Sequence, residues 1–291
     1  MSHLLRSSIA QLGRKTASRA MSSSSPAAAD TWSANQYSKF LGERTQPSRD
    51  LLARVPLAQP RRIIDLGCGP GNSTAVVAAR YPTADLAGVD TSQDMLRKAR
   101  ETLPGVPFDL ADVTTFQPPG PVDLYFSNAV FQWLPNGTRL EVLQRLVSHL
   151  APGGVLAFQV PFNMTEPSHR AMADVAHAPG TPWEDTMRRA GIKRDQFPAP
   201  IELYDGLQPL CADVQIWCTT YFHVLENHEA IVEWVRGTGL APYLTVLDDA
   251  QREGYLAAYL ERVKEAYPAQ ADGKVMLPYP RLFVVATKSG A

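Results

Sequence analysis

A glycine-rich turn between a short apolar strand and a helix constrains this chain more than any other stretch. Ile63 and Ile64 are followed by an acid, Asp65, and then by glycines at alternate positions, Gly67, Gly69 and Gly71. Residues 73–80 have a composition that favours a helix. Because glycine lets the backbone turn tightly and approach a ligand closely, strand, turn and helix together predict the entry unit of a nucleotide-binding α/β sheet.

The residues around this turn repeat strand and helix patterns at the spacing of βαβ units. We expect strands over 85–90, 107–110, 122–127 and 155–160, with helices at 30–57, 93–103 and 138–150. Ser92 is the expected N-cap of the helix that starts at residue 93. The alternation predicts an α/β fold with a mostly parallel, doubly wound sheet.

The rhythm changes after Pro161. Residues 162–212 contain Asn, His and Pro clusters with two helical pieces, near 168–177 and 182–191, and we predict that they form a mainly helical cap insertion. Beyond it we expect a strand over 213–224, helices over 227–236 and 248–267, and a closing strand over 279–287. The folded domain should therefore cover residues 30–291.

Composition and charge exclude several classes of protein. The 291 residues carry a net charge of −1, which argues against a nucleic-acid-binding surface. Three cysteines without CxxC spacing argue against a disulfide framework or a zinc site, so no metal is expected. No apolar run approaches the roughly 18–20 residues that a membrane span requires. We expect a monomer that takes a small-molecule substrate.

Residues 1–29 differ from the rest of the chain. They contain no acid, four basic residues and many Ser and Ala, a composition typical of an organelle transit peptide. A disordered tail with no address is the alternative, and Met21 is a candidate second start. We therefore predict an N-terminal extension outside the fold and a cytoplasmic or mitochondrial location.

Two further acids point to the ligand of the turn. Asp90 ends the second expected strand and should reach the same crevice as the turn, where a carboxylate can accept both hydroxyls of a ribose. Asp112 follows the third strand, where a base would extend. A dinucleotide fingerprint requires glycine at its sixth position, which is Asn72 here, and Asp65 before the turn suits a cationic group better than a pyrophosphate.

These features resemble the seven-strand (class I) S-adenosylmethionine-dependent methyltransferases. The resemblance is carried by Ile64-Asp65-Leu66-Gly67-Cys68-Gly69-Pro70-Gly71, Gly88-Val89-Asp90, Ala111-Asp112 and Leu150-Ala151-Pro152-Gly153-Gly154. It implies a Rossmann-like seven-strand sheet with S-adenosylmethionine as cofactor. It also implies that the cofactor is bound by Tyr37, Asp65, Gly67, Cys68, Gly69, Asn72, Asp90, Thr91, Met95, Asp112, Val113, Asn128, Ala129 and Trp133. A glycine turn without a ligand, and Asp112 as a plain turn residue, are the alternatives.

One branch of that family, the trans-aconitate methyltransferases, is similar along most of the chain. The resembling stretches are 32–40, 128–134, 159–161, 234–240 and 280–283. Their activity implies methylation of one carboxylate of trans-aconitate to a methyl ester. A phenolic or carbon acceptor, such as a quinone precursor, is the alternative substrate class; a binding module without activity is a third possibility, although the turn and Asp90 are intact.

The chemistry of methylating a carboxylate indicates which kinds of residue the site needs. A carboxylate with a pKa near 4 is already anionic at pH 7 and needs no general base. The enzyme then has to orient the oxygen and remove water from it. A tricarboxylate requires cationic partners, for which arginine has the matching geometry. Our substrate-binding candidates are Arg44, Arg236, Arg281 and Tyr243, with His169 as a candidate catalytic helper; exposed positions are the alternative for Arg236, Arg281 and His169.

Overall fold

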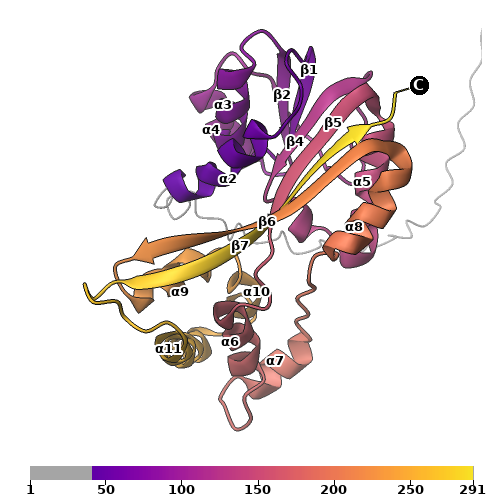
Figure 1. Cartoon of the computed structure of the whole chain (residues 1–291). Coiled ribbons are helices and arrows are strands. Elements are labelled where there is room, and N and C mark those ends of the chain that lie inside the picture. The colour runs from indigo at the N-terminus through magenta and orange to yellow at the C-terminus, as the bar shows by residue number, and fades with distance from the viewer. Residues whose placement is uncertain (1–40, 291) are drawn as a thin grey trace, which may run out of the picture. The chain divides into compact units, whose positions relative to one another are not determined.

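The structure, a computed structural model, describes residues 41–290 (Figure 1). The predicted N-terminal extension and the cofactor contact of Tyr37 lie outside these residues. None of the helices within 41–290 is long and apolar enough to cross a membrane.

A seven-stranded sheet lies at the centre of the described chain. Its strands are β1 (Arg62–Leu66), β2 (Asp85–Asp90), β3 (Phe108–Leu110), β4 (Val122–Asn128), β5 (Leu150–Pro161), β6 (Cys211–Leu225) and β7 (Val275–Lys288). Their order is β3-β2-β1-β4-β5-β7-β6. The first five strands are parallel, and β7 is antiparallel to both β5 and β6. The predicted seven-strand α/β sheet is confirmed.

Helices cover both faces of this sheet. Because successive strand residues point to opposite faces, Ile63 and Ile64 of β1 belong to different cores. On the Ile63 side lie α2 (Leu41–Ala53) and α3 (Asn72–Arg80), and on the Ile64 side lie α5 (Arg139–Ser148) and α8 (Pro200–Leu207). The α4 helix (Gln93–Thr102) packs beside β2 and β3, and Ser92 caps it as predicted by accepting a hydrogen bond from the Met95 N–H at 3.4 Å.

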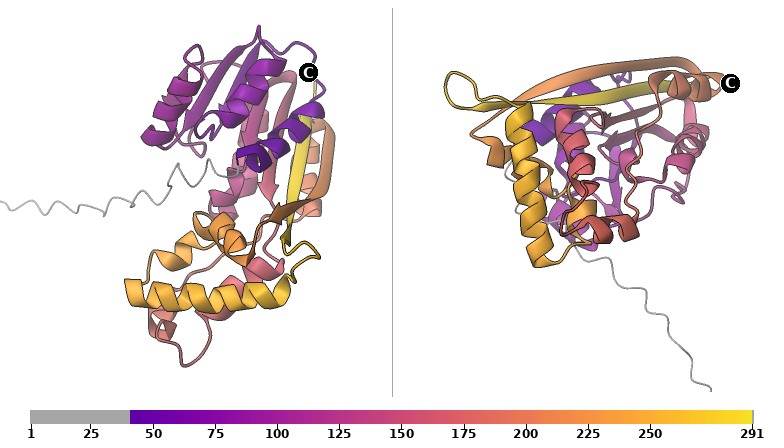
Figure 2. Two further views of the ribbon diagram at one scale, coloured as in Figure 1. Left: turned by 90° about the vertical axis from the view of Figure 1, so that its left-hand side faces the viewer. Right: turned by 90° about the horizontal axis from the view of Figure 1, so that it is seen from below.

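The β6–β7 hairpin extends beyond the sheet and carries a second core. β5 pairs with β7 only as far as Arg281, whereas β6 and β7 continue to pair out to Leu225 and Val275. Against this free half pack α6 (Pro167–Ala176), α7 (Glu184–Ala190), α9 (His228–Arg236), α10 (Ala241–Leu244) and α11 (Asp249–Ala266). Figure 1 and the left view of Figure 2 show these helices gathered along the projecting hairpin.

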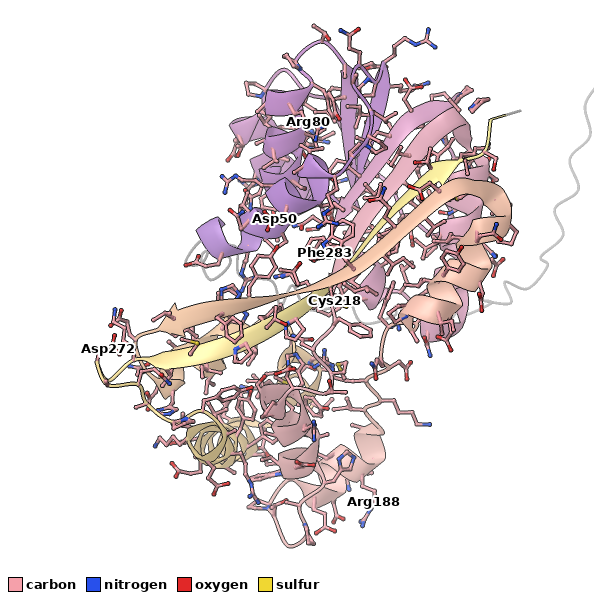
Figure 3. All side chains as sticks on the ribbon, in the orientation of Figure 1. Asp50, Arg80, Arg188, Cys218, Asp272 and Phe283 are labelled. Atoms are coloured by element: carbon pink, nitrogen blue, oxygen red, sulfur yellow. The ribbon has the colours of Figure 1, made fainter. Side chains whose placement is uncertain are left out.

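Side chains along the hairpin mark the passage from one core to the other (Figure 3). Phe283 and Cys218 are labelled near its middle and Asp272 at its outer end. Phe283 belongs to the core under α2, and Tyr279, four residues earlier on β7, belongs to the second core. Arg281 lies between them and is 5% exposed. The hairpin is therefore a continuous support for both regions.

The structure differs from the expected elements at several places. Neither α8 nor α10 was anticipated, and α2 ends at Ala53 instead of residue 57. β5 already starts at Leu150, and β7 starts at Val275 instead of residue 279. Segment 162–212, which we expected to form one cap insertion, packs on two different cores. Its α6 and α7 join the second core, whereas α8 packs through Leu203 and Leu207 on the sheet. The second core takes most of its remaining residues from 225–279, which lie far beyond the expected insertion.

Candidate active site

The glycine turn after β1 is held in a conformation that side chains resist. Gly67, Gly69 and Gly71 all have positive φ, at 66°, 54° and 94°. A Cβ on Gly67 would lie 2.4 Å from a methyl carbon of Val130, whereas a Cβ on Gly69 would meet nothing within 4 Å. Gly67 is thus required for packing, while Gly69 borders open space.

Asp65 secures the helix that follows the turn. Its carboxylate is fully buried and accepts hydrogen bonds from the Ser73 hydroxyl at 2.7 Å and the Thr74 hydroxyl at 2.6 Å. Burial raises the pKa of Asp65 to about 7, although both hydroxyls act in the opposite direction. Both bonds use Oδ2, and Oδ1 has no partner within the described chain. Oδ2 therefore positions α3, whereas Oδ1 retains its capacity to accept a hydrogen bond.

Asp90 connects the end of β2 to the turn. Its two oxygens accept backbone N–H groups, Oδ2 from Gly69 and Oδ1 from Ser92, both at 2.9 Å. A carboxylate oxygen accepts more than one hydrogen bond, so both can still receive hydroxyl donors. The same carboxylate therefore shapes the turn and presents acceptors beside it.

The remaining predicted cofactor residues, in the turn, on α4 and just after β2 and β3, have different environments. Asp112 is exposed, and its Oδ1 accepts the N–H and hydroxyl of Thr114 at 2.8 and 2.7 Å, an Asx turn. Val113, Met95 and Cys68 are buried, and Thr91 is exposed. Cys68 donates its N–H to Val89 at 3.0 Å, which continues β1–β2 pairing into the turn.

The end of β4 is strained. Ala129 has φ of 61°, the one non-glycine residue with positive φ between residues 41 and 290. Its N–H donates to the Gln159 carbonyl at 2.9 Å, and the Ser127 hydroxyl donates to the Leu66 carbonyl at 2.9 Å. Such strain persists only where neighbours enforce it and is frequent at functional sites. It directs the chain from Asn128 to Val130, which contacts Gly67.

A cavity of about 380 Å³ opens beside this strand end. Asn128, Ala129 and the half-exposed Trp133 line it on the β4 side. Its charged lining is strongly unbalanced, with one acid against five cations: Asp195 against Arg44, Arg139, Lys193, Arg194 and Arg281. A cavity with this charge favours an anionic ligand.

Arg281 is connected to the end of β4 through a buried amide. Its Nη1 donates to Gln159 Oε1 at 3.1 Å, and Gln159 Nε2 donates to Asn128 Oδ1. Gln159 is completely buried, and Arg281 lies 5.1 Å from the Tyr279 ring centroid. The arginine is therefore fixed in position relative to Asn128.

The two other predicted cavity residues differ in charge. Arg44 donates to the Trp234 carbonyl at 3.4 Å and stands 5.5 Å from the Trp234 ring centroid. His169 is 5% exposed, with Nδ1 at 3.3 Å from the Ser168 hydroxyl. Burial, reinforced by Arg194, lowers the pKa of His169 to about 3. His169 is thus neutral at pH 7, and the surface position that we considered for it is wrong.

Two substrate-binding candidates, Arg236 and Tyr243, and one cofactor candidate, Asn72, lie outside the cavity lining. Arg236 is exposed at the last residue of α9, as our alternative for it anticipated. Tyr243 is buried in the second core, stacked on Tyr255 with ring centroids 6.0 Å apart. Asn72 begins α3 and lines a separate groove against α2. None of the three contributes to the cavity described here.

Sequence reasoning missed Lys193, Arg194 and Trp234 as cavity residues. Lys193 and Arg194 belong to an irregular segment after α7, where a basic pair reads as a solvated loop. Arg139 was also missed, but its guanidinium is already occupied. It is 4% exposed and donates to four acceptors, on Leu134, Asn136, Gln196 and Gln132.

Comparison with known proteins assigns the chain to a family. A methyltransferase domain family matches residues 63–154. The trans-aconitate 2-methyltransferase of Rhodopseudomonas palustris (strain BisB18) is 54% identical over 257 residues, covering 88% of this chain and 99% of that protein. The protein of the same name from Rhizobium etli is 50% identical with the same coverage. The chain belongs to the trans-aconitate 2-methyltransferase family.

Solved structures agree on the fold. The YcgJ protein from Bacillus subtilis has a TM-score of 0.55 at 11% identity and covers 84% of this chain and 100% of its own. Phosphoethanolamine N-methyltransferase 2 from Haemonchus contortus has a TM-score of 0.52 at 15% identity, over 88% and 56% of the two chains. These identities are low, so the likeness concerns the fold.

As a member of the trans-aconitate 2-methyltransferase family, the chain is a methyltransferase whose cofactor is S-adenosylmethionine. The residues present fit that cofactor. Open space borders Gly69, Asp90 retains acceptor capacity, and Asp65 has a buried oxygen without a partner. Acids near the turn suit a sulfonium cation, as the sequence indicated.

Proposed function

We propose that this chain transfers a methyl group from S-adenosylmethionine to one carboxylate of trans-aconitate, giving a methyl ester. The observation that carries the proposal is the arginine-rich cavity at the end of β4, where Ala129 lines the cavity and the next residue, Val130, packs against Gly67 of the glycine turn. Support comes from relatives more than 50% identical that are named trans-aconitate 2-methyltransferase. A tricarboxylate is the type of ligand that such a lining compensates.

Our proposal assigns the cofactor to the turn and the neighbouring strand ends. Asp90 would accept the ribose hydroxyls, Gly69 would allow close approach, and Asp65 Oδ1 would face the cationic methionine portion. Asp112, with Val113, would lie beside the adenine, and Asn128 and Ala129 beside the sulfonium. When bound, the cofactor supplies an electrophilic methyl group.

The acceptor's chemistry explains how such a site can work without a base. A carboxylate is ionised at pH 7, so no proton has to be removed before transfer. In our proposal Arg281 and Arg44 orient the acceptor, while the aromatic and apolar lining reduces the water around its oxygen. Proximity of this kind can supply up to roughly 7–11 kcal/mol of the barrier.

A phenolic or carbon acceptor is the less favoured alternative. It requires a general base with a pKa close to the working pH. His169 is the cavity histidine, and burial lowers its pKa to about 3, far below that range. A base this weak removes a phenolic proton poorly.

A methyl-transfer assay tests the proposal. The purified protein is incubated with labelled S-adenosylmethionine and a panel of di- and tricarboxylates, with phenols as controls, and products are identified by mass spectrometry. We expect a monomethyl ester of trans-aconitate. Methylation of a phenol with no ester from any carboxylate would reject the proposal.

Three accessory proposals concern assembly, domain limits and location. We propose a monomer, testable by light scattering, and one methyltransferase domain over residues 30–291.

Residues 1–29 are proposed as an extension that directs the protein to mitochondria, with a cytoplasmic location as the alternative. Fusion of these residues to a fluorescent protein distinguishes the two, since retention in the cytoplasm rejects targeting.

A further inference from the structure

Arg194 enters the cavity without an acidic partner. It lies between α7 and α8, is half-buried, and lines the cavity. Its Nη1 donates to the Gly239 carbonyl at 3.1 Å and contacts Met172 Sδ at 3.6 Å. Among residues 41–290 no acid forms an ion pair with it, and the neighbouring Asp195 acts electrostatically on Arg139 instead.

The groups that do act on Arg194 are phenols. They are four tyrosines of the second core and of β7: Tyr243, Tyr255, Tyr259 and Tyr279. Burial raises the pKa of the first three phenols, so these remain protonated at neutral pH. Burial lowers the pKa of the Arg194 guanidinium, but an arginine stays charged at pH 7. A half-buried cation is thus left without a counter-ion, which is unfavourable until an anion arrives.

Arg194 also differs from Arg281 in the elements that hold it. Its contacts, Met172 and Gly239, belong to α6 and to the segment after α9 in the second core. Arg281 is instead tied through Gln159 to Asn128 at the end of β4. The cavity therefore contains cations held by two different sets of elements. A ligand with several carboxylates can contact both sets at once.

Resting on the function proposed above, we propose that Arg194 binds an acceptor carboxylate other than the one that is methylated, and so selects tricarboxylates over dicarboxylates. The reacting carboxylate has to lie near Asn128 and Ala129, beside the methyl donor. A guanidinium on the reacting oxygen would withdraw its charge and weaken the nucleophile. Arg194 is suited to a remote carboxylate, which its planar fork can bind in a bidentate manner.

The test compares Arg194→Met with an outside control, Arg189→Met. Arg189 is an exposed arginine on α7, so the same change is made in the same insertion but outside the cavity. Each variant is assayed with trans-aconitate and with three dicarboxylates that each lack one of its carboxylates: glutaconate, mesaconate and itaconate. Removing the arginine from the protein and removing one carboxylate from the substrate are then the two changes of a double-mutant cycle.

We expect Arg194→Met to lower kcat/KM for trans-aconitate about 100-fold, in the range found for truncated buried charge pairs. For the dicarboxylate that lacks the bound carboxylate, kcat/KM should change less than about 3-fold, because the contact is already absent. Arg189→Met should leave all four values unchanged. A Tm equal to or above that of the parent is expected for Arg194→Met, since the change removes an uncompensated charge.

Equal losses with all four acids would show a structural residue and overturn the proposal, as would no loss with any. Arg194→Lys provides a second variant, with an intermediate loss expected because the charge stays and the fork is removed. Calorimetric titration of trans-aconitate in the presence of S-adenosylhomocysteine gives a readout without turnover. If the parent binds trans-aconitate but forms no ester, the proposed reaction fails while the Arg194 contact is still tested. If the parent neither binds nor methylates it, both proposals fail.

Discussion

The proposed cofactor end and the proposed acceptor end of this site are built in opposite ways. At the cofactor end, Asp65 and Asp90 belong to the adjacent parallel strands β1 and β2 and Gly69 to the turn between β1 and α3. Hydrogen bonds join Asp90 to Gly69 and Asp65 to Ser73 and Thr74, all within a short stretch of chain. At the acceptor end, Arg44, Arg194 and Arg281 come from α2, an irregular segment and β7, and they meet only in the folded protein. One end is acidic and the other is basic.

This difference suggests a division of work between the regions. A turn that must hold the same cofactor can be encoded locally, because a few glycines and acids fix its shape. A cavity that must recognise a particular acid collects charge from distant elements, and the β6–β7 hairpin supports both. If the division is correct, substitutions at one end should leave binding at the other end largely intact.

The largest effect is expected at Asp90. Asp90→Ala removes the acceptor of the Gly69 and Ser92 N–H groups as well as the proposed ribose contacts. Hydrogen bonds to a charged group contribute about 1.5–3 kcal/mol each, so S-adenosylmethionine affinity should fall at least about 100-fold. Calorimetry measures this, and Asp109→Ala, at an exposed carboxylate on β3, is the matched control. Unchanged affinity in Asp90→Ala would remove the turn from the cofactor site.

A comparable loss, confined to the acceptor, is expected at Arg281. Arg281→Met leaves the Gln159 amide without its guanidinium partner and removes a cavity charge. We expect the KM for trans-aconitate to rise about 100-fold, while the Kd for S-adenosylmethionine changes less than about 3-fold. Arg236→Met, at an exposed site outside the cavity, should change neither constant by more than about 2-fold. An equal response of both arginines would mean that net charge, and not position, governs acceptor binding.

Two glycine substitutions separate folding from cofactor access. Gly67→Ala forces a Cβ against Val130 at positive φ, and we expect a loss of about 2–3 kcal/mol in the free energy of unfolding. Gly69→Ala has the same unfavourable φ but no clash, so it should lose only about 1 kcal/mol. Its S-adenosylmethionine affinity should nevertheless fall, because the methyl group enters the open space. Denaturant titration and calorimetry measure the two effects, and full affinity in a folded Gly69→Ala would place the cofactor elsewhere.

At neutral pH the smallest effect is that of His169, and it grows only as the pH falls. His169 has a pKa of about 3 in the folded protein and about 6.5 when unfolded. Between these values the unfolded chain binds the extra proton, so the contribution of His169 to stability is complete above about pH 6.5 and is lost as the pH falls towards 3. Replacing it by Gln should flatten the pH dependence of unfolding by up to about 1.4 kcal/mol per pH unit in that window. Identical slopes in parent and variant would contradict a buried, neutral His169.

The contrast between features encoded within a short stretch and features assembled from distant elements also explains which predictions from the sequence were correct. β2 was predicted with its observed ends because its apolar run and terminal acid are local signals. The start of β7 was missed because Pro278 argues against a strand at that point, although Pro280 lies inside the strand that was expected. Both prolines precede Arg281, the first residue of β7 that pairs with β5, so the N–H that proline lacks is not needed for that pairing. The Pro280 carbonyl still accepts the Phe162 N–H at 2.9 Å.

Arg194 shows most clearly what could not be predicted from the sequence. Nothing within ten residues of it distinguishes a cavity arginine from a solvated one. Its surroundings come from Met172, Gly239 and tyrosines of the second core, which are distant in sequence. Arg236 was selected for the opposite reason, since it stands beside a glycine loop, and it is exposed. A local sequence pattern can indicate the chemistry of a site such as the glycine turn. The arginines of the cavity come from separate elements, and only the folded structure shows that they lie together.

Binding measurements on Asp90→Ala, Arg281→Met and the double variant test the division between the two ends most directly. S-adenosylmethionine and trans-aconitate are each titrated calorimetrically into the parent and the three variants. We predict that Asp90→Ala weakens cofactor binding alone, that Arg281→Met weakens acceptor binding alone, and that the double variant combines the changes within about 0.5 kcal/mol. Loss of cofactor affinity in Arg281→Met as large as that in Asp90→Ala would contradict a site built from two separable ends.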